Sequence, residues 1–369
     1  MASVPNMHYI SAGYPLISHF TTEKQSFMGG FNLGGINATG QVPSMPGNWG
    51  LIDLETPKSA YTKPSYRDPG KEMQLVFSDE FNVDGRSFYP GDDPYWEAVD
   101  LHYWAWPYTY DSCDVGTVPN QTVNGTPHAA TVNGDTSAGG ALSYLPGQRL
   151  SRCTCPGESH PGPLHADGTF VGRSAPEIDV FEAQVSGHPP TGQVSQSAQW
   201  APFNERYLWK NGTDTTMIAD ATLTKLNPYL GGAFQQATSA VTETNQACYE
   251  FHGACFSVYG FEYKPGFDDA YISWIADGKV SWTLKQQGMD PDEQVKISGR
   301  PIPQEPLSRD WQYLIVNLGM SMNFGEVDLE HLKFPVTMRV DWIRVYQSKQ
   351  GINVGCSPKN FPTEQYINK

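Results

Sequence analysis

The sequence predicts an all-β protein, a jelly-roll type β-sandwich with an irregular N-terminal arm. Three observations lead to this fold class. Short β-type runs separated by turn residues follow one another from about residue 71 to 347. No stretch of fifteen residues there keeps the apolar spacing of an amphipathic helix. Glycine and proline number 36 and 29 of 369 residues, which implies many turns. Many short strands with few helices are typical of β-sandwiches.

The chain is expected to contain three parts. Residues 1–70 are rich in Gly, Pro, Asn and Ser and predict an extended arm. Residues 71–347 form the β-domain, and residues 348–369 form an irregular tail. The β-type runs begin at Leu75–Phe81, and further strands are expected at Pro176–Val185, Gln193–Trp200, Cys255–Tyr263, Tyr313–Leu318 and Met338–Tyr346.

The clearest hairpin joins two runs of alternating apolar residues, Ala270–Ile275 and Lys279–Leu284. Asp277 and Gly278 lie between them, and this dipeptide suits the positive φ values of a two-residue turn.

The charge and the motif inventory exclude several classes of function. The net charge of −15 repels phosphate backbones and anionic lipids, so nucleic acid is not an expected partner. No Gly-x-Ser-x-Gly or phosphate-binding glycine motif occurs, and neither a cofactor nor a metal is expected. No window is long and apolar enough to span a membrane, and residues 1–30 lack the apolar core of a signal peptide.

The cysteines and the acidic, tryptophan-rich composition favour the secretory pathway. The six cysteines are even in number and include two close pairs, of which Cys248 with Cys255 closes the easiest disulfide loop. A zinc site at Cys153 and Cys155 with two following histidines fits no common spacing. Four sequons are no more than chance provides. The remaining disulfide candidates are Cys113, Cys153, Cys155 and Cys356, and the sequons lie at Asn37, Asn120, Asn124 and Asn211.

The candidate catalytic residues lie in the run Glu177-Ile-Asp-Val-Phe-Glu182. Side chains alternate along a strand, so Glu177 and Asp179 share one face. Glu182 reaches that face only if the strand carries a one-residue bulge, a feature often found beside active sites. Three carboxylates then line one face, as the nucleophile and acid/base of a retaining glycosidase require. A carboxylate between two others raises the pKa of the acid.

The alternative is a solvated acidic face. With 39 acidic residues in 369, a given three-position acidic pattern is expected about 0.4 times by chance. The chain also contains a rival, Glu326-Val-Asp328-Leu-Glu330, with regular strand spacing. Gly325 and Pro335 leave that run little room in a sheet, so a loop or solvated edge is expected there.

The motif Glu-Ile-Asp-Val-Phe-Glu resembles the bulged active-site signature of glycoside hydrolase family 16. Three further parts of the chain resemble that family. Its opening strand is similar to Leu75–Asn82, and its closing strand is similar to Met338–Tyr346. Its late hairpin is similar to Tyr259–Tyr263 together with Ile272–Gly278. Gly85–Asp93, Trp106–Gly116 and Arg173–Glu182 resemble, more narrowly, the fungal β-glucan-synthesis-associated proteins of the Kre/Skn group. The likeness extends from about residue 27 to the end.

This resemblance implies a concanavalin-like jelly roll acting on β-glucan in fungal cell-wall assembly. Glu177 would be the nucleophile, Asp179 a helper and Glu182 the acid/base. It also implies a type II membrane glycoprotein whose anchor precedes this chain, with the domain on the lumenal or extracellular side. Candidate glucan-binding residues are Trp104, Trp106, Gln184, Gln199 and Trp200. Trp209 is a further candidate for stacking on a sugar, and for each tryptophan a position in the core is an equal alternative.

The sequence departs from the Kre/Skn group at two places. Ser308–Gln312 resembles an insertion ahead of the expected strand Tyr313–Leu318, and a longer stretch is missing elsewhere. Members carry a multi-strand stretch between the regions matching Asp100–Tyr103 and Trp106–Tyr110, and here Trp104-Ala105 joins these directly. The sandwich is therefore expected to be incomplete. Two hypotheses follow: a retaining glucan hydrolase or transglycosylase, supported by the intact carboxylates, and a non-catalytic glucan-binding scaffold or inactive isoform, supported by the missing stretch.

Overall fold

The computed structural model divides the chain into two compact units. The first comprises residues 1–63, 74–104 and 340–349, and the second comprises residues 64–73, 105–339 and 350–369. The structure describes residues 50–367 except 84–85, 87, 90–92, 94, 99–156, 158, 172–176, 201–207, 232–235, 267–268, 290–291, 298–299, 303–313, 323, 355–356 and 359. Residues 1–49 of the predicted arm therefore lie outside the described part.

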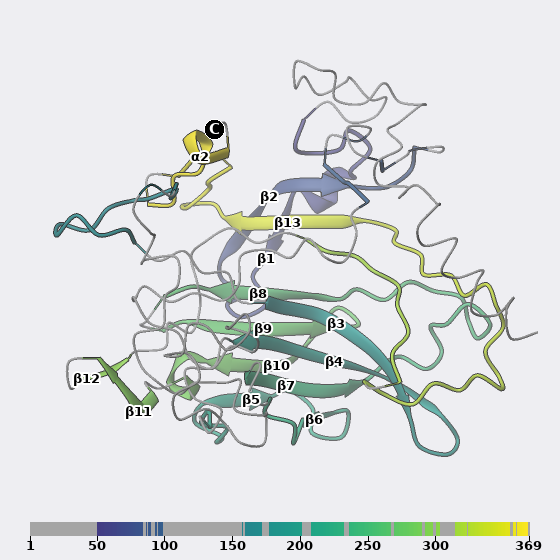
Figure 1. Ribbon diagram of the computed structural model, residues 1–369. Helices are drawn as coiled ribbons and strands as arrows, with labels where there is room; N and C mark the ends of the chain where they lie inside the picture. Colours follow the sequence, from purple (N-terminus) through teal and green to yellow (C-terminus); the bar gives the residue numbers. More distant parts are fainter. Residues whose placement is uncertain are drawn as a thin grey trace, which may run out of the picture. The chain divides into compact units, whose positions relative to one another are not determined.

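The first unit contains most of a three-stranded sheet (Figure 1). Its order is β1 (Thr62–Pro64), β2 (Glu72–Asp79) and β13 (Ile343–Ser348), preceded by a short 3-10 helix at Lys58–Ala60. Arg344 on β13 donates two hydrogen bonds, of 2.9 and 2.6 Å, to the carboxylate of Glu80. Such a bidentate pair fixes geometry as well as charge, and here it fastens the β2 end to β13.

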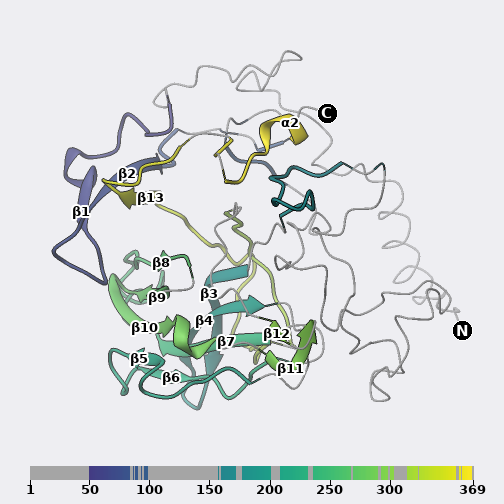
Figure 2. The same cartoon turned by 90° about the vertical axis from the view of Figure 1, so that its left-hand side faces the viewer.

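The second unit contains two four-stranded antiparallel sheets. One has the order β3-β4-β7-β6 and the other the order β5-β10-β9-β8, and Figure 2 shows them as two layers. The first sheet consists of β3 (Glu177–Ser186), β4 (Thr191–Trp200), β7 (Gln236–Glu243) and β6 (Thr224–Leu226). The second consists of β5 (Thr216–Ile218), β10 (Lys279–Lys285), β9 (Tyr271–Ala276) and β8 (Gly260–Lys264). The other described elements of this unit are short. They are the strand pair β11 (Asp292–Ile297) and β12 (Arg300–Ile302), a 3-10 helix at Gln286–Gly288 and the helix α2 (Glu364–Ile367).

The core of the second unit lies between these two sheets. Trp274 on β9 and Trp282 on β10 are fully buried, and their rings stack with centroids 4.3 Å apart. Each indole N–H donates across the interface, from Trp274 to the carbonyl of Asp179 and from Trp282 to the carbonyl of Gln196. The all-β sandwich prediction is thereby confirmed.

The predicted hairpin is confirmed as β9 and β10. Lys279 pairs with Ala276 across the turn, and Asp277 and Gly278 adopt φ values of 49° and 73°. Two successive positive φ values are what a twisted two-residue hairpin requires, and they explain why aspartate and glycine occupy these positions.

Other predicted strands differ from the structure. The expected Cys255–Tyr263 strand begins only at Gly260, and the expected Met338–Tyr346 strand begins at Ile343. Residues 314–318 of the expected Tyr313–Leu318 strand form no strand and expose Leu314, Ile315, Val316 and Leu318. Strand β7 was not predicted, because its small polar residues carry no clear alternation of apolar and polar side chains.

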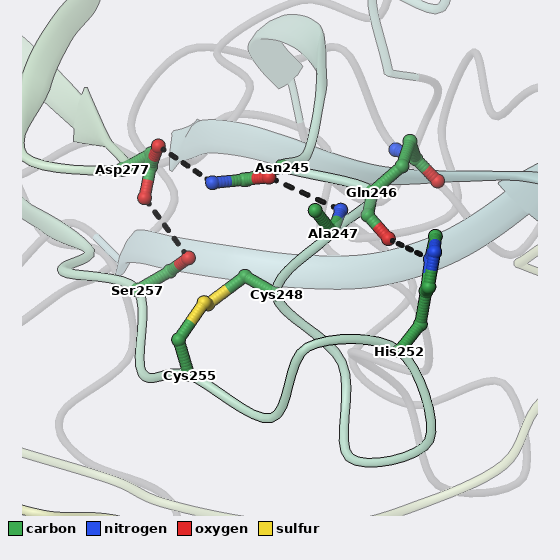
Figure 3. Close-up of a disulfide and its surroundings, with 8 residues drawn as sticks. All are labelled: Asn245, Gln246, Ala247, Cys248, His252, Cys255, Ser257 and Asp277. Atoms are coloured by element: carbon green, nitrogen blue, oxygen red, sulfur yellow. Dashed lines mark hydrogen bonds between the residues drawn. A yellow bond between two sulfur atoms is a disulfide. The ribbon is translucent and has the colours of Figure 1, made fainter.

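A disulfide joins Cys248 and Cys255, the pair that the spacing favours (Figure 3). Asp277 in the β9–β10 turn accepts hydrogen bonds from the side chains of Asn245 (3.4 Å) and Ser257 (3.0 Å), on either side of the disulfide loop. The loop is therefore attached to the hairpin at both of its ends.

Across the described residues, the structure contains no helix with the length and apolar character that crossing a membrane requires.

Candidate active site

Strand β3 carries the bulge that the acidic run requires. Asp179 pairs with Ser197 and Glu182 pairs with Ser195, so three steps along β3 match two steps along β4. The extra residue falls within Val180 and Phe181, which together oppose Gln196 on β4. The bulge shifts the alternation by one residue and brings Glu182 to the face of Glu177 and Asp179.

Paired residues of neighbouring strands extend this face across the sheet. Directly opposed residues of an antiparallel pair point to the same side. The rows are Glu177–Gln199–Ala237, Asp179–Ser197–Ser239, Glu182–Ser195–Val241–Lys225 and Gln184–Gln193–Glu243. Within the described strands, Lys225 and Glu243 are therefore the other charged groups on the face of the three carboxylates.

Asp179 lies at the centre of the candidate site. Its Oδ2 accepts hydrogen bonds from Ser197 Oγ (2.8 Å) and Gln199 Nε2 (3.1 Å). Burial, followed by the neighbouring Glu177, raises the pKa of Asp179 to about 6, although the two hydrogen bonds act in the opposite direction. Asp179 is therefore shielded from water and lies close enough to Glu177 to feel its negative charge.

Glu182 has the pKa of a general acid at neutral pH. Burial is the largest cause, and the charges of Asp179 and Glu177 add to it, raising the pKa of Glu182 to about 7. The repulsion expected from a central carboxylate is therefore present. A carboxylic acid with a pKa near the working pH both holds and releases a proton readily.

Gln199 presents an unused hydrogen-bond acceptor beside the carboxylates. Its side chain is 8% exposed, and its Nε2 donates to Asp179 and to Ser197 Oγ. These contacts orient the amide, because the reverse orientation would place Oε1 against a carboxylate oxygen. Oε1 is buried and has no hydrogen-bond partner among the residues that the structure describes. A hydroxyl donor from a ligand would satisfy this oxygen.

The other predicted binding residues fall into different places. Gln184 is half-buried and donates to Gln193 Oε1 at 3.2 Å on the outer row of the same face. Trp200 and Trp209 are buried in the core cluster, so their rings are not available for stacking on a glucan, and the core interpretation applies to both. Trp104 and Trp106 lie outside the described residues.

The remaining covalent and metal candidates are mostly not described. Cys113, Cys153, Cys155 and Cys356 lie outside the described residues, as do the sequons at Asn37, Asn120 and Asn124. Asn211 is exposed, as an acceptor of glycosylation must be. In the described ranges, no cluster of three His, Cys, Asp or Glu side chains could hold a metal ion.

The rival acidic run forms a turn. The described residues between Gly325 and His331 belong to no strand, and Asp328 Oδ1 accepts hydrogen bonds from the backbone N–H groups of Glu330 and His331. The side chain of His331 contacts Asp328 Oδ2 at 2.7 Å. This is the loop that the flanking Gly325 and Pro335 predict.

Two residues of the site were not singled out from the sequence, Ser195 and Ser197. Both are buried, Ser197 binds Asp179, and Ser195 opposes Glu182. The signal was present in the alternation of β4, where Ser195, Ser197 and Gln199 occupy every second position. Every second residue of β4 points to the face of the carboxylates, so the polar residues at these positions could have been recognised as neighbours of the acidic strand.

The fold and the site together define a β-sandwich protein with three carboxylates on one face of a bulged strand. The model of the SKN1/KRE6/Sbg1 family of beta-glucan synthesis-associated proteins matches residues 4–105 and 105–369. The chain belongs to this family.

Curated relatives agree with the family assignment. The chain is 36% identical to the beta-glucan synthesis-associated protein SKN1 of Candida albicans, over 86% of this chain and 51% of that protein. It is 33% identical to KRE6 of Saccharomyces cerevisiae, over 86% of this chain and 52% of that protein. The chain thus spans about half the length of the curated relatives it matches. No solved structure matches the chain.

The alignments also bear on the expected missing stretch. The match to the Candida albicans SKN1 protein extends over 407 positions, whereas 86% of 369 residues is about 317, so about 90 positions have no residue of this chain. The two matches of the family model meet at Ala105, next to the Trp104–Ala105 junction. A stretch absent at that junction accounts for both findings.

Proposed function

We propose that this chain is a retaining β-glucan-active glycosidase or transglycosylase that works in fungal cell-wall β-1,6-glucan biosynthesis. One observation carries the proposal: the bulge in β3 brings Glu182, with a pKa of about 7, to the face that holds Glu177 and Asp179. A retaining mechanism needs a nucleophilic carboxylate and a protonated carboxylic acid close together, and this strand presents both.

The residues divide the reaction between them. Glu177 attacks the anomeric carbon, while Glu182 gives its proton to the glycosidic oxygen as the bond to that oxygen breaks. A covalent glycosyl ester on Glu177 results. Glu182, now ionised, takes a proton from an incoming hydroxyl, whose oxygen attacks the anomeric carbon and releases Glu177. Burial raises the pKa of Glu182 most, and the charge of Asp179, which lies between the two glutamates, adds to it.

The identity of the incoming hydroxyl distinguishes hydrolysis from synthesis. Water gives hydrolysis and a sugar hydroxyl gives a longer glucan. The relatives are named for an association with beta-glucan synthesis, which supports the second outcome. Gln199 Oε1 is buried beside Asp179 and has no partner in the described part of the chain, which supports a ligand that brings hydroxyl donors.

The cellular setting follows from the same proposal. The Cys248–Cys255 disulfide suits an oxidising compartment, and Asn211 is exposed for glycosylation. We therefore propose the secretory pathway and the lumenal or extracellular side of the plasma membrane, with membrane attachment through an N-terminal anchor.

A second candidate function is a non-catalytic glucan-binding scaffold. The exposed apolar side chains at residues 314–318 and the roughly 90 alignment positions without a counterpart both support a sandwich that lacks partner strands. A sheet that lacks partners can keep a ligand-binding face and lose the closed site that catalysis needs.

Mass spectrometry of β-1,3- and β-1,6-gluco-oligosaccharides incubated with the purified chain tests the proposal. The expected result is shortened or lengthened products, absent with Glu177→Gln. A second version carries the relatives' stretch inserted between Trp104 and Ala105. If only that version gives products, the assignment of the active site is correct and this shorter chain is an inactive form. Binding without products from either version would overturn the enzyme and favour the scaffold.

A further inference from the structure

A buried amide lies directly behind the bulge in β3. Gln196 is the residue of β4 that opposes Val180 and Phe181, and its side chain is fully buried on the core face. Its Nε2 donates to the carbonyl of Val180 at 3.0 Å and to the carbonyl of Ile275 at 2.9 Å. One amide group therefore joins the bulged strand to β9 in the facing sheet.

The facing sheet carries a bulge of its own at the same place. Val280 pairs with Ile275 and Trp282 pairs with Trp274, so Ser281 is an extra residue in β10. The hydroxyl of Ser281 donates to Gln196 Oε1 at 2.6 Å. The Gln196 side chain thus bonds Val180 in the first bulge, Ser281 in the second bulge and Ile275 on the strand paired with the second bulge.

The other carbonyl at the start of the β3 bulge also has a buried donor. Trp274 Nε1 donates to the carbonyl of Asp179 at 3.0 Å, and the stacked ring of Trp282 holds the Trp274 indole in place. A bulge disrupts the local ladder of backbone hydrogen bonds, and buried carbonyls need replacement donors. Gln196 and Trp274 supply these donors from the core side.

We propose that Gln196 and Trp274 are positioning residues of the active site, which hold the β3 bulge in the one register that places Glu182 beside Asp179. Both residues lie on the core face, opposite the carboxylates, and they act through the backbone. The effect on catalysis rests on the proposed function. The role of the two residues in holding the bulge does not depend on it.

The consequence of losing these donors is a change in the environment of Glu182. A strand that relaxes to regular alternation turns Glu182 away from Asp179 and toward the core. Glu182 would then leave the field of the other two carboxylates and the geometry needed for proton transfer. A misplacement of about 1 Å in a catalytic group costs up to about 100-fold in rate.

Two substitutions test the proposal. Gln196→Met keeps the size and removes all three side-chain hydrogen bonds, and Trp274→Phe keeps an aromatic ring and removes only the bond to Asp179. The matched control is Ser273→Ala, because Ser273 is fully buried in the same hairpin and bonds Thr283 rather than the bulge. The measurements are kcat, KM and the pKa of Glu182, from the ¹³C carboxyl shifts of glutamate-labelled chain assigned with Glu182→Gln.

Gln196→Met is expected to lower kcat at least about tenfold with KM changed less than about threefold, and to shift the pKa of Glu182 away from about 7, because both the burial of Glu182 and its distance from the other two carboxylates change. Trp274→Phe should act in the same direction and less, and the control should change neither quantity. If Gln196→Met does not fold, Trp274→Phe decides. An unchanged pKa and kcat in the folded variants, or the same changes in the control, would overturn the proposal.

The carboxyl titration separates this inference from the proposed function. If the original chain shows no turnover but the pKa of Glu182 shifts in the variants and not in the control, the enzyme assignment fails and the positioning role holds. If turnover is present and Glu182 titrates identically in all folded variants, the positioning role fails and the enzyme assignment holds.

Discussion

Two runs of three carboxylates with spacing close to that of a strand differ in their surroundings, and of these two the run Glu177–Glu182 lies on a sheet face. Glu177, Asp179 and Glu182 lie on a strand paired along its length with β4, whose alternate residues are Ser195, Ser197 and Gln199. Glu326, Asp328 and Glu330 have the more regular spacing, yet they lie in a turn. The comparison teaches that acidic spacing alone does not make a site. A partner strand that desolvates the carboxylates and supplies polar neighbours is also needed.

The environments move the pKa values of Glu182 in the first run and of Asp328 in the second run in opposite directions. Burial and neighbouring carboxylates raise the pKa of Glu182 to about 7. The hydrogen bond from His331 is the largest cause that lowers the pKa of Asp328. Glu182 is therefore close to half protonated at neutral pH, whereas the pKa of Asp328 is lowered.

Removing the nucleophile should have the largest effect. Glu177→Gln keeps the shape of the side chain and removes its negative charge, so turnover of β-gluco-oligosaccharides is expected to fall about 1,000-fold or more. Binding of the same oligosaccharides, measured by calorimetry, should persist. An unchanged rate would show that Glu177 is not the nucleophile.

The pH profile should follow the proton on Glu182. Protonated Glu182 is needed to release the leaving oxygen, so kcat/KM is expected to fall about tenfold per pH unit above pH about 7. Glu182→Gln should be slow at every pH and lose this basic limb. A substrate with an activated aryl leaving group should be affected less, because it needs no proton. A basic limb that survives in Glu182→Gln would assign the acid elsewhere.

The raised pKa of Glu182 also predicts a cost in stability. The folded state holds this proton more tightly than the unfolded chain, so ionisation from pH about 4.5 to about 7 lowers the free energy of unfolding. Because Glu182 is only partly buried, we expect Glu182→Gln to stabilise the protein by about 1–2 kcal/mol at pH 8. The difference should vanish below pH about 4.5. Denaturant unfolding at both pH values measures it, and a variant less stable at pH 8 would contradict the sign.

The smallest effect is expected in the second run. Asp328→Asn keeps an oxygen that accepts from the backbone N–H groups of Glu330 and His331. Neither the melting temperature nor the rate on oligosaccharides should change beyond the error of the measurement. A loss of activity in Asp328→Asn would give the second run a part in the site.

The sequence was sufficient for the parts of the fold that local patterns determine. The β9–β10 hairpin follows from its apolar alternation and its Asp277-Gly278 turn. The spacing of Glu177 and Glu182 made a one-residue bulge the condition for a shared face, and β3 has this bulge. The solvated turn at Asp328 follows from Gly325 and Pro335.

The sequence was not sufficient where a segment depends on distant partners. Residues 314–318 have the apolar content of a strand and form none, which agrees with a sheet that lacks the stretch absent near Ala105. Strand β7 has small polar residues and is a strand because β4 and β6 pair with it on both sides. The buried position of Trp200 was left open, because a tryptophan at a strand end suits either a core or a ligand surface.

The amide of Gln196 also fixes how the two layers of the sandwich are aligned along their strands. Its three hydrogen bonds reach Val180 in its own sheet and Ile275 and Ser281 in the other. Sliding one layer past the other by a single residue, about 3.3 Å, would separate Gln196 from both partners in the facing sheet. An insertion or deletion in β9 or β10 should therefore be tolerated only with a compensating change at Gln196, so these positions are expected to vary together within the family.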